Sequence, residues 1–156
     1  MKKTLTLAFL IKEDRICLAM KKRGFGEGNW NGYGGKVEEG ESITAAAVRE
    51  IKEESGVVVG ERDLFEVALI DFIFEDGKHL LVHTYFTRTW QREPVETEEM
   101  RPRWYAFDAI PYDLMWADDI HWLPCVLKGE KLRGTVYFNS DGTSIKDMEW
   151  RVVDSF

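Results

Sequence analysis

The chain has 156 residues and a mass of 18.1 kDa, which is the size of one domain built around a single core. Apolar residues make up 44% and charged residues 31%, the proportions of a soluble globular protein. The formal net charge is −7. This charge argues against a protein that binds a nucleic-acid backbone, because such proteins meet phosphates with Lys and Arg. It does not exclude a small phosphorylated ligand, since a bound cation reverses the local sign.

The two cysteines and the N-terminus favour a cytoplasmic protein with no membrane partner. Cys17 and Cys125 lie in apolar runs and are expected to be unpaired. The apolar stretch near the N-terminus, Leu5–Ile11, is short, is followed by charges and lacks a small-residue cleavage site. It is also well below the roughly 20 apolar residues that span a bilayer.

The predicted elements begin with a hairpin, a loop and a helix. Leu5–Ile11 and Ile16–Met20 are β-rich runs joined by a charged turn, which predicts two paired strands. A glycine-rich loop follows over Gly24–Gly40. Ser42–Ser55 has helical composition, begins with a good N-cap residue, and is followed by Gly56, which favours a C-terminal stop.

The second half of the chain is mostly β-rich. Five further strands are predicted, in chain order Leu64–Phe74, Leu80–Thr89, Arg103–Phe107, Gly134–Asn139 and Ser144–Val152. The first two and the last two of these flank turn sequences, so each pair predicts a hairpin. Asp119–Leu127 predicts a helix whose start is capped by one of two neighbouring aspartates. The pattern indicates an α+β fold with mixed or antiparallel strands rather than an alternating βαβ array.

The predicted helix Ser42–Ser55 carries a cluster of glutamates. At about 100° per residue, Glu50, Glu53 and Glu54 fall on one face, with Glu54 at the margin of the apolar arc. That arc consists of Ile43, Ala47, Val48 and Ile51. Like charges at these spacings repel, and the negative end of the helix dipole lies at the same end. These unfavourable features together suggest a cation that offsets them.

Two interpretations of the glutamate cluster follow from the helix alone. Oxygen ligands without His or Cys nearby favour a hard cation such as Mg²⁺ or Mn²⁺. Arg49 lies four residues before Glu53 and could pair with it to hold it in place. In the second interpretation, the glutamates form a solvated acidic face with Arg49 and Lys52 as partners.

A longer pattern decides between them. From Gly35 the sequence runs Gly35-x5-Glu41-x7-Arg49-Glu50-Ile51-x-Glu53-Glu54-x-Gly56-Val57. This segment, residues 35–57, resembles at every position the box of the Nudix hydrolases, which cleave nucleoside diphosphates linked to another moiety. The resemblance implies a single Nudix domain over residues 1–156, with a mixed β-sheet core packed between helices as an α/β/α sandwich.

The resemblance also implies roles for the residues of the box. Glu50, Glu53 and Glu54 would be ligands of Mg²⁺, or of Mn²⁺ in its place. Gly35 would contribute a carbonyl or a close backbone approach, and Arg49 would orient a glutamate. The metal would bridge carboxylates and phosphate oxygens while an activated water attacks phosphorus in line. Glu54 is the expected base and Glu53 the next candidate.

Segments outside the box resemble the animal-type Nudix enzymes that hydrolyse oxidised purine nucleoside triphosphates, such as 8-oxo-dGTP and 2-hydroxy-dATP. These segments are Met20–Gly26, Trp30–Gly35, Pro94–Pro102 and Met115–Trp122. The resemblance implies that the substrate is held by Thr6, Lys21, Phe25, Asn31, Phe72, Phe74, Trp116, Asp118 and Asp119. It also implies an extra metal or water contact from Glu99, opposite the box helix.

The chemistry of these residues suits a purine. Trp116 offers a stacking face, and Asn31 offers a donor and an acceptor for base edges. Asp118 and Asp119 could share a proton, so that one donates while the other accepts. Each also has a structural alternative: the aspartates as a helix cap, Trp116 as a core or interface residue, and Asn31 as a turn residue.

The leading interpretation is a monomeric, Mg²⁺-dependent diphosphatase that converts oxidised purine nucleoside triphosphates to monophosphate and pyrophosphate, with no nucleic-acid partner. A second keeps the chemistry but changes the substrate to ordinary nucleotides, a dinucleoside polyphosphate or an RNA 5′ end. A third is a Nudix fold that binds a nucleotide without catalysis. Intact Glu50, Glu53 and Glu54 argue against the third.

Overall fold

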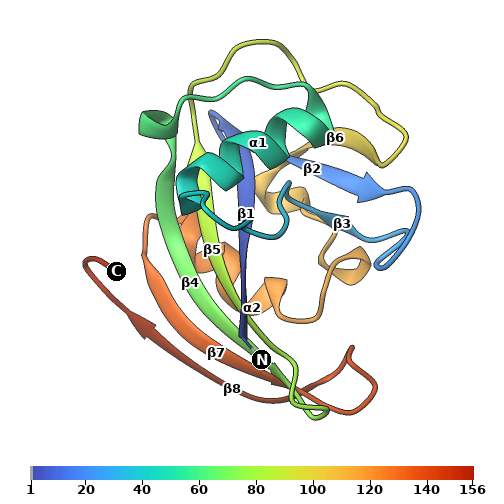
Figure 1. The fold of residues 1–156 in the computed structure, drawn as a ribbon, viewed down its shortest axis with the longest axis vertical. Coiled ribbons are helices and arrows are strands. Elements are labelled where there is room, and N and C mark those ends of the chain that lie inside the picture. The colour runs from blue at the N-terminus through green and yellow to red at the C-terminus, as the bar shows by residue number, and fades with distance from the viewer. Residues whose placement is uncertain (1) are drawn as a thin grey trace.

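The computed structural model describes residues 2–156 and shows a mixed β-sheet with α1 on one face and α2 on the other (Figure 1). The helices are α1 (Ile43–Ser55) and α2 (Asp119–Leu127). The strands are β1 (Lys2–Lys12), β2 (Arg15–Lys21), β3 (Trp30–Asn31), β4 (Phe65–Phe74), β5 (His79–Thr87), β6 (Met100–Ala106), β7 (Leu132–Phe138) and β8 (Ile145–Val152). Short 3-10 turns cover Glu61–Asp63, Phe107–Ala109 and Tyr112–Leu114. The predicted α+β sandwich is confirmed.

The strand order is β3-β2-β1-β5-β4-β7-β8, with β6 also paired to β2. The three predicted hairpins are present as the antiparallel pairs β1–β2, β4–β5 and β7–β8. Two parallel contacts join them into one sheet, between β1 and β5 and between β4 and β7. The short strand β3 lies inside the segment predicted as a glycine-rich loop, where it pairs with the end of β2.

Strand β1 is buried on both faces and separates the two cores. Ala8 and Leu10 pack with Ile51 of α1, whereas Phe9 and Ile11 pack with Trp122 of α2. All four β1 side chains are essentially inaccessible to solvent. A strand covered on both sides has a continuous apolar sequence instead of an alternating one. One strand therefore supports both the α1 side and the α2 side of the molecule.

Helix α1 begins and ends where its capping residues indicate. The Ser42 hydroxyl accepts a hydrogen bond from the Ala45 amide at 3.2 Å, and Gly56 adopts the left-handed conformation with φ of 80°. Ala47 and Ile51 are buried, as the helical wheel predicts. The glutamates lie beside this buried arc, with Glu54 at its margin.

The two cysteines are free, as expected; Cys17 is buried and Cys125 half-buried. No helix within residues 2–156 is long and apolar enough to cross a bilayer.

Candidate active site

The loop that leads into α1 lies against β1 and α1 through glycines. A side-chain Cβ on Gly34 would lie 1.9 Å from the carbonyl oxygen of Thr6. One on Gly35 would lie 2.6 Å from Oε1 of Glu50. At position 34 backbone occupies the space that a side chain would need, so glycine is required there. At position 35 a side chain would displace the Glu50 carboxylate from its present place. The predicted close approach at Gly35 is present.

Arg49 is the centre of an ion-pair network on the glutamate face of α1. Its guanidinium donates to both carboxylate oxygens of Glu41, at 2.7 and 2.9 Å. It also donates to Glu50 at 2.9 Å and to Glu53 at 3.4 Å. The hydrogen bonds from Arg49 lower the pKa of Glu41 to about 2. Arg49 therefore orients two of the three clustered glutamates, and Glu41 fixes Arg49.

Glu54 occupies a different environment from Glu50 and Glu53. Its Oε1 accepts a hydrogen bond from the Gly34 amide at 2.8 Å. Burial raises the pKa of Glu54 to about 7, the Gly34 amide opposes this shift, and the negative charge of Glu50 adds to it. This carboxylate faces the pocket described below. The Gly34 amide therefore fixes the direction of the Glu54 carboxylate, while burial disfavours its ionised form.

The donor set of this face suits a hard divalent cation. Three carboxylates lie on one helix face beside a glycine-lined loop, and oxygen ligands of this kind prefer Mg²⁺ and similar ions. Within residues 2–156, no three acidic, His or Cys side chains are already at metal-holding distances. Glu50 and Glu53 instead share Arg49. Burial raises the pKa of Glu54, and the charges of Glu50 and Glu53 add to this shift; a cation would offset that repulsion.

Glu99 lies beside the C-terminal end of α1, on a turn tied to that end by Thr97. The Thr97 hydroxyl donates to the carbonyl of Glu54 at 3.4 Å and accepts from the Glu99 amide at 3.3 Å. The Glu99 carboxylate accepts a hydrogen bond from Nε of Arg23 at 2.8 Å. Glu99 is thus close to the glutamate face but is paired with an arginine.

The three consecutive basic residues 21–23 have different surroundings: two form ion pairs and one lines the pocket. Lys22 pairs with Glu96 at 2.7 Å and Arg23 pairs with Glu99. Only Lys21 of the three lines the pocket.

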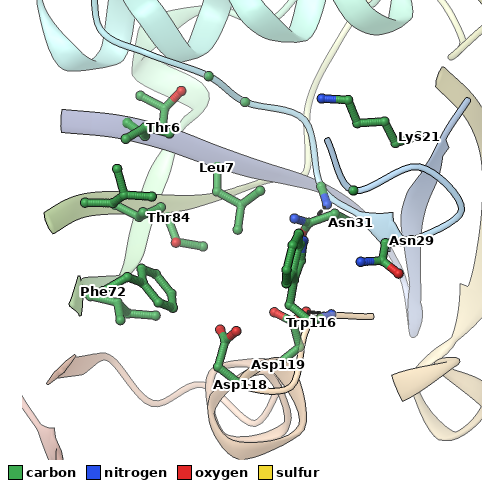
Figure 2. A pocket seen from close by; sticks show the side chains of 18 of the residues that line it. Thr6, Leu7, Lys21, Asn29, Asn31, Phe72, Thr84, Trp116, Asp118 and Asp119 are labelled. Carbon is green, nitrogen blue, oxygen red and sulfur yellow. Dashed lines mark hydrogen bonds between the residues drawn. The ribbon is translucent and has the colours of Figure 1, made fainter. Parts of the chain in front are cut away.

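A cavity of about 290 Å³ lies between the sheet, the loop before α1 and the start of α2 (Figure 2). The residues predicted to contact substrate all line it, namely Thr6, Lys21, Phe25, Asn31, Phe72, Phe74, Trp116, Asp118 and Asp119. Glu54 and Gly35 line it as well. The pocket is therefore continuous with the glutamate face, although the two are far apart in the sequence.

Two aromatic rings stand at the side of this pocket. Trp116 is half-buried and stacks on Phe25, with ring centroids 5.4 Å apart. Phe25 is 76% exposed, and the Lys78 ammonium lies 5.7 Å from its ring centre. Trp116 therefore forms a wall of the pocket and is not a fully buried core residue.

The neighbouring aspartates are buried at the start of α2. Asp118 is 3% exposed and accepts a hydrogen bond from Nε1 of Trp122 at 2.8 Å. Asp119 is 2% exposed and accepts from the Trp116 amide at 3.1 Å. Asp118 occupies the N-cap position of α2, as predicted, but its side chain makes no capping hydrogen bond. The bond to Trp122 directs its carboxylate to the pocket instead.

Burial raises the pKa of both carboxyls. For Asp119 the charge of Asp118 raises the pKa further. Two adjacent carboxylates in such a place favour a shared proton over two full charges.

Several pocket residues are absent from the predicted set. Leu7, Val82 and Thr84 belong to it, from alternate positions of β1 and β5 that share the sheet face of Phe72. Strand alternation in the sequence predicts which residues of each strand share a face. The pairing of β1 with β5 is also needed to know that these faces lie together in one pocket wall. Asn29 also lines the pocket, from the loop before β3. Asn31 accepts a hydrogen bond from the Gly32 amide at 2.8 Å, so it combines the turn role with a pocket position.

Comparison with known proteins agrees with this geometry. The NUDIX domain profile matches residues 1–125. An oxidized purine nucleoside triphosphate hydrolase from Danio rerio is 44% identical over 144 residues, covering 92% of this chain and 90% of the relative. The enzyme of the same name from Mus musculus is 43% identical, covering 97% and 96%. The crystal structure of a MutT protein from Bacillus halodurans superposes with a TM-score of 0.80 at 25% identity, covering 95% and 97%.

The chain belongs to the Nudix hydrolase family. The resemblance inferred from residues 35–57 is thereby confirmed. Enzymes of this family generally use divalent metal cations.

The buried aspartate pair gives a testable dependence of stability on pH. An acid whose pKa is raised by folding binds its proton more tightly in the folded state, so it stabilises the fold most below the unfolded pKa of about 3.9. This contribution is lost as the pH rises through the folded pKa. We expect Asp119→Asn to raise the free energy of unfolding at pH 7. We also expect the free energy of unfolding of this variant to fall less steeply than that of the wild type as the pH rises above ~4. Urea unfolding across this pH range measures the effect.

Asp113→Asn is the matched control, because Asp113 is an exposed carboxylate near the same helix. An identical pH dependence of unfolding for wild type, Asp113→Asn and Asp119→Asn would contradict the raised pKa of Asp119.

Proposed function

We propose that the protein hydrolyses oxidised purine nucleoside triphosphates to the monophosphate and pyrophosphate, with Mg²⁺ as the cation and Mn²⁺ as a substitute. The observation that carries this proposal is the buried pair Asp118 and Asp119 in a pocket that also contains Trp116 and Asn31. Two relatives more than 40% identical over most of the chain are named as hydrolases of such substrates.

The aspartate pair supplies a physical basis for recognising an oxidised base. Oxidation of a purine changes which ring atoms donate and which accept hydrogen bonds. Asp118 and Asp119 can together offer one donor and one acceptor when they share a proton, and the proton can reside on either. Trp116 provides a stacking surface beside them. A pocket of this kind accepts more than one oxidised purine and disfavours bases that leave a buried carboxyl unpaired.

The phosphate end of the substrate would lie toward Glu54 and Lys21. Figure 2 places Lys21 at the side of the pocket away from the two aspartates. The Lys21 ammonium would neutralise phosphate charge there, and a bound divalent cation would supply further charge neutralisation at the glutamates. Glu54, whose direction is fixed by the Gly34 amide, would receive the proton of the attacking water.

The activity itself is tested by a substrate panel. Purified protein with Mg²⁺ is assayed for pyrophosphate release from 8-oxo-dGTP, 2-hydroxy-dATP, dGTP and dATP. We expect kcat/KM at least about 10-fold higher for an oxidised purine than for its normal counterpart, because one matched hydrogen bond to a buried charged group contributes ~1.5–3 kcal/mol. Equal kcat/KM within each pair would contradict the proposed substrate class.

Glu54→Gln tests the assigned base. The amide keeps the size of the side chain but can neither take a proton at neutral pH nor bind a cation well, so we expect kcat to fall by at least about 100-fold. Glu149→Gln on β8 is the matched control, since it removes one exposed carboxylate that does not line the pocket. This variant should leave kcat unchanged. Circular dichroism checks that both variants fold. Wild-type turnover by a folded Glu54→Gln protein would overturn the role of Glu54.

Asp118→Asn tests the base pocket. The amide can still accept from Trp122, so the fold should persist. It can no longer exchange a proton with Asp119, and we therefore expect the ratio of kcat/KM between 8-oxo-dGTP and 2-hydroxy-dATP to change by about 10-fold or more. Unchanged rates with all four nucleotides would show that Asp118 does not contact the base.

A further inference from the structure

Two buried hydroxyls in the pocket wall, those of Thr6 and Thr84, have no hydrogen-bond partner among residues 2–156. Thr6 already belongs to the residues expected to hold the substrate, whereas Thr84 does not. Thr84 of β5 is completely inaccessible to solvent, and within residues 2–156 its Oγ1 has no hydrogen-bond partner. Burying a hydroxyl without a hydrogen bond is unfavourable, and most buried polar side-chain atoms in proteins are paired. A valine would have nearly the same shape without this cost. The hydroxyl is therefore not explained by packing.

The surroundings of Thr84 are apolar. Thr84 lies opposite Leu7 in the parallel pairing of β5 with β1 and opposite Ala68 in the antiparallel pairing with β4. On the same sheet face, Val82 and Phe72 line the pocket beside it. Among these strand residues, Thr84 alone carries a polar side-chain atom.

The polar groups of the pocket thus lie on two sides of it. Figure 2 shows Thr84 and Phe72 on one side, with Asn31 and Trp116 across from them and the two aspartates below. Asp118, Asp119 and Asn31 all have protein partners for at least one of their polar atoms. The hydroxyls of Thr84 and Thr6 have no such partner, although both residues line the pocket.

We propose that Thr84 is a specificity-determining residue whose hydroxyl forms a hydrogen bond with the purine base from the side opposite Asn31. This inference rests on the proposed function, because it requires a purine in the pocket. A hydroxyl can donate or accept, so it can pair with either kind of atom on the base edge. Binding of a base with a polar atom at that position removes the cost of the unpaired hydroxyl. A base without one keeps that cost and binds more weakly.

Thr87 on the same strand offers a matched comparison. It is equally inaccessible, but its Oγ1 donates to the carbonyl of Thr89 at 3.1 Å. It does not line the pocket. Removing the Thr87 hydroxyl breaks a bond within the protein, whereas removing the Thr84 hydroxyl breaks none.

The test measures affinity and stability separately in Thr84→Val, Thr84→Ser and Thr87→Val. Metal-free isothermal titration with 8-oxo-dGMP and 2-hydroxy-dAMP reports base binding without turnover, and thermal unfolding reports stability. We expect Thr84→Val to bind at least one of these monophosphates about 5-fold more weakly, with Tm unchanged or raised. Thr84→Ser should keep the wild-type affinity. Thr87→Val should lower Tm and leave the affinities unchanged.

Two results would overturn the role of Thr84. One is an unchanged affinity of Thr84→Val for both monophosphates. The other is a fall in the Tm of Thr84→Val like that of Thr87→Val, together with an equal loss of affinity for both monophosphates. Failure of the proposed function has a different signature. In that case the wild-type protein itself binds dGMP and dAMP as tightly as the oxidised forms.

Discussion

Burial of β1 on both faces is the constraint on which both halves of the candidate site depend. One face of the strand holds α1, and the other holds α2 and the apolar floor of the pocket. The loop before α1 runs along β1 so closely that Gly34 has no room for a side chain. The same glycine directs its amide to Glu54. One strand and one loop thus hold the glutamate face and the adjoining pocket in a fixed arrangement.

Two groups of carboxylates lie at opposite ends of this arrangement, and their surroundings give them different chemistry. On α1, Arg49 balances Glu50 and Glu53, while Glu54 faces the pocket with a pKa raised by burial. At the start of α2, Asp118 and Asp119 are surrounded by aromatic and apolar groups, and their hydrogen bonds come from neutral donors. The first group suits a cation and phosphates, whereas the second suits a proton and a neutral base.

Local sequence patterns predicted most of the elements, because turns, caps and apolar runs act over short distances. Ser42 and Gly56 bound α1 as expected. The parallel pairings of β1 with β5 and of β4 with β7 leave no local signal in the sequence. Without them, the sequence does not distinguish Thr84 from other strand residues. The pocket residues came from the family resemblance, not from periodicity. Asp118 lies at the predicted N-cap position, but the expected side-chain cap is absent, and its carboxylate bonds to Trp122 instead.

We infer that the buried aspartates share a proton, because burial raises the pKa of both carboxyls, and that this proton is used to recognise the base. Carboxyl carbon-13 NMR of labelled aspartates, with Asp118→Asn and Asp119→Asn for assignment, follows their titration directly. The account predicts that at least one of the two carboxyls titrates well above the ordinary aspartate pKa of about 3.9, and that its titration shifts when 8-oxo-dGMP binds. Titration of both carboxyls at or below that value, unaffected by the nucleotide, would contradict it.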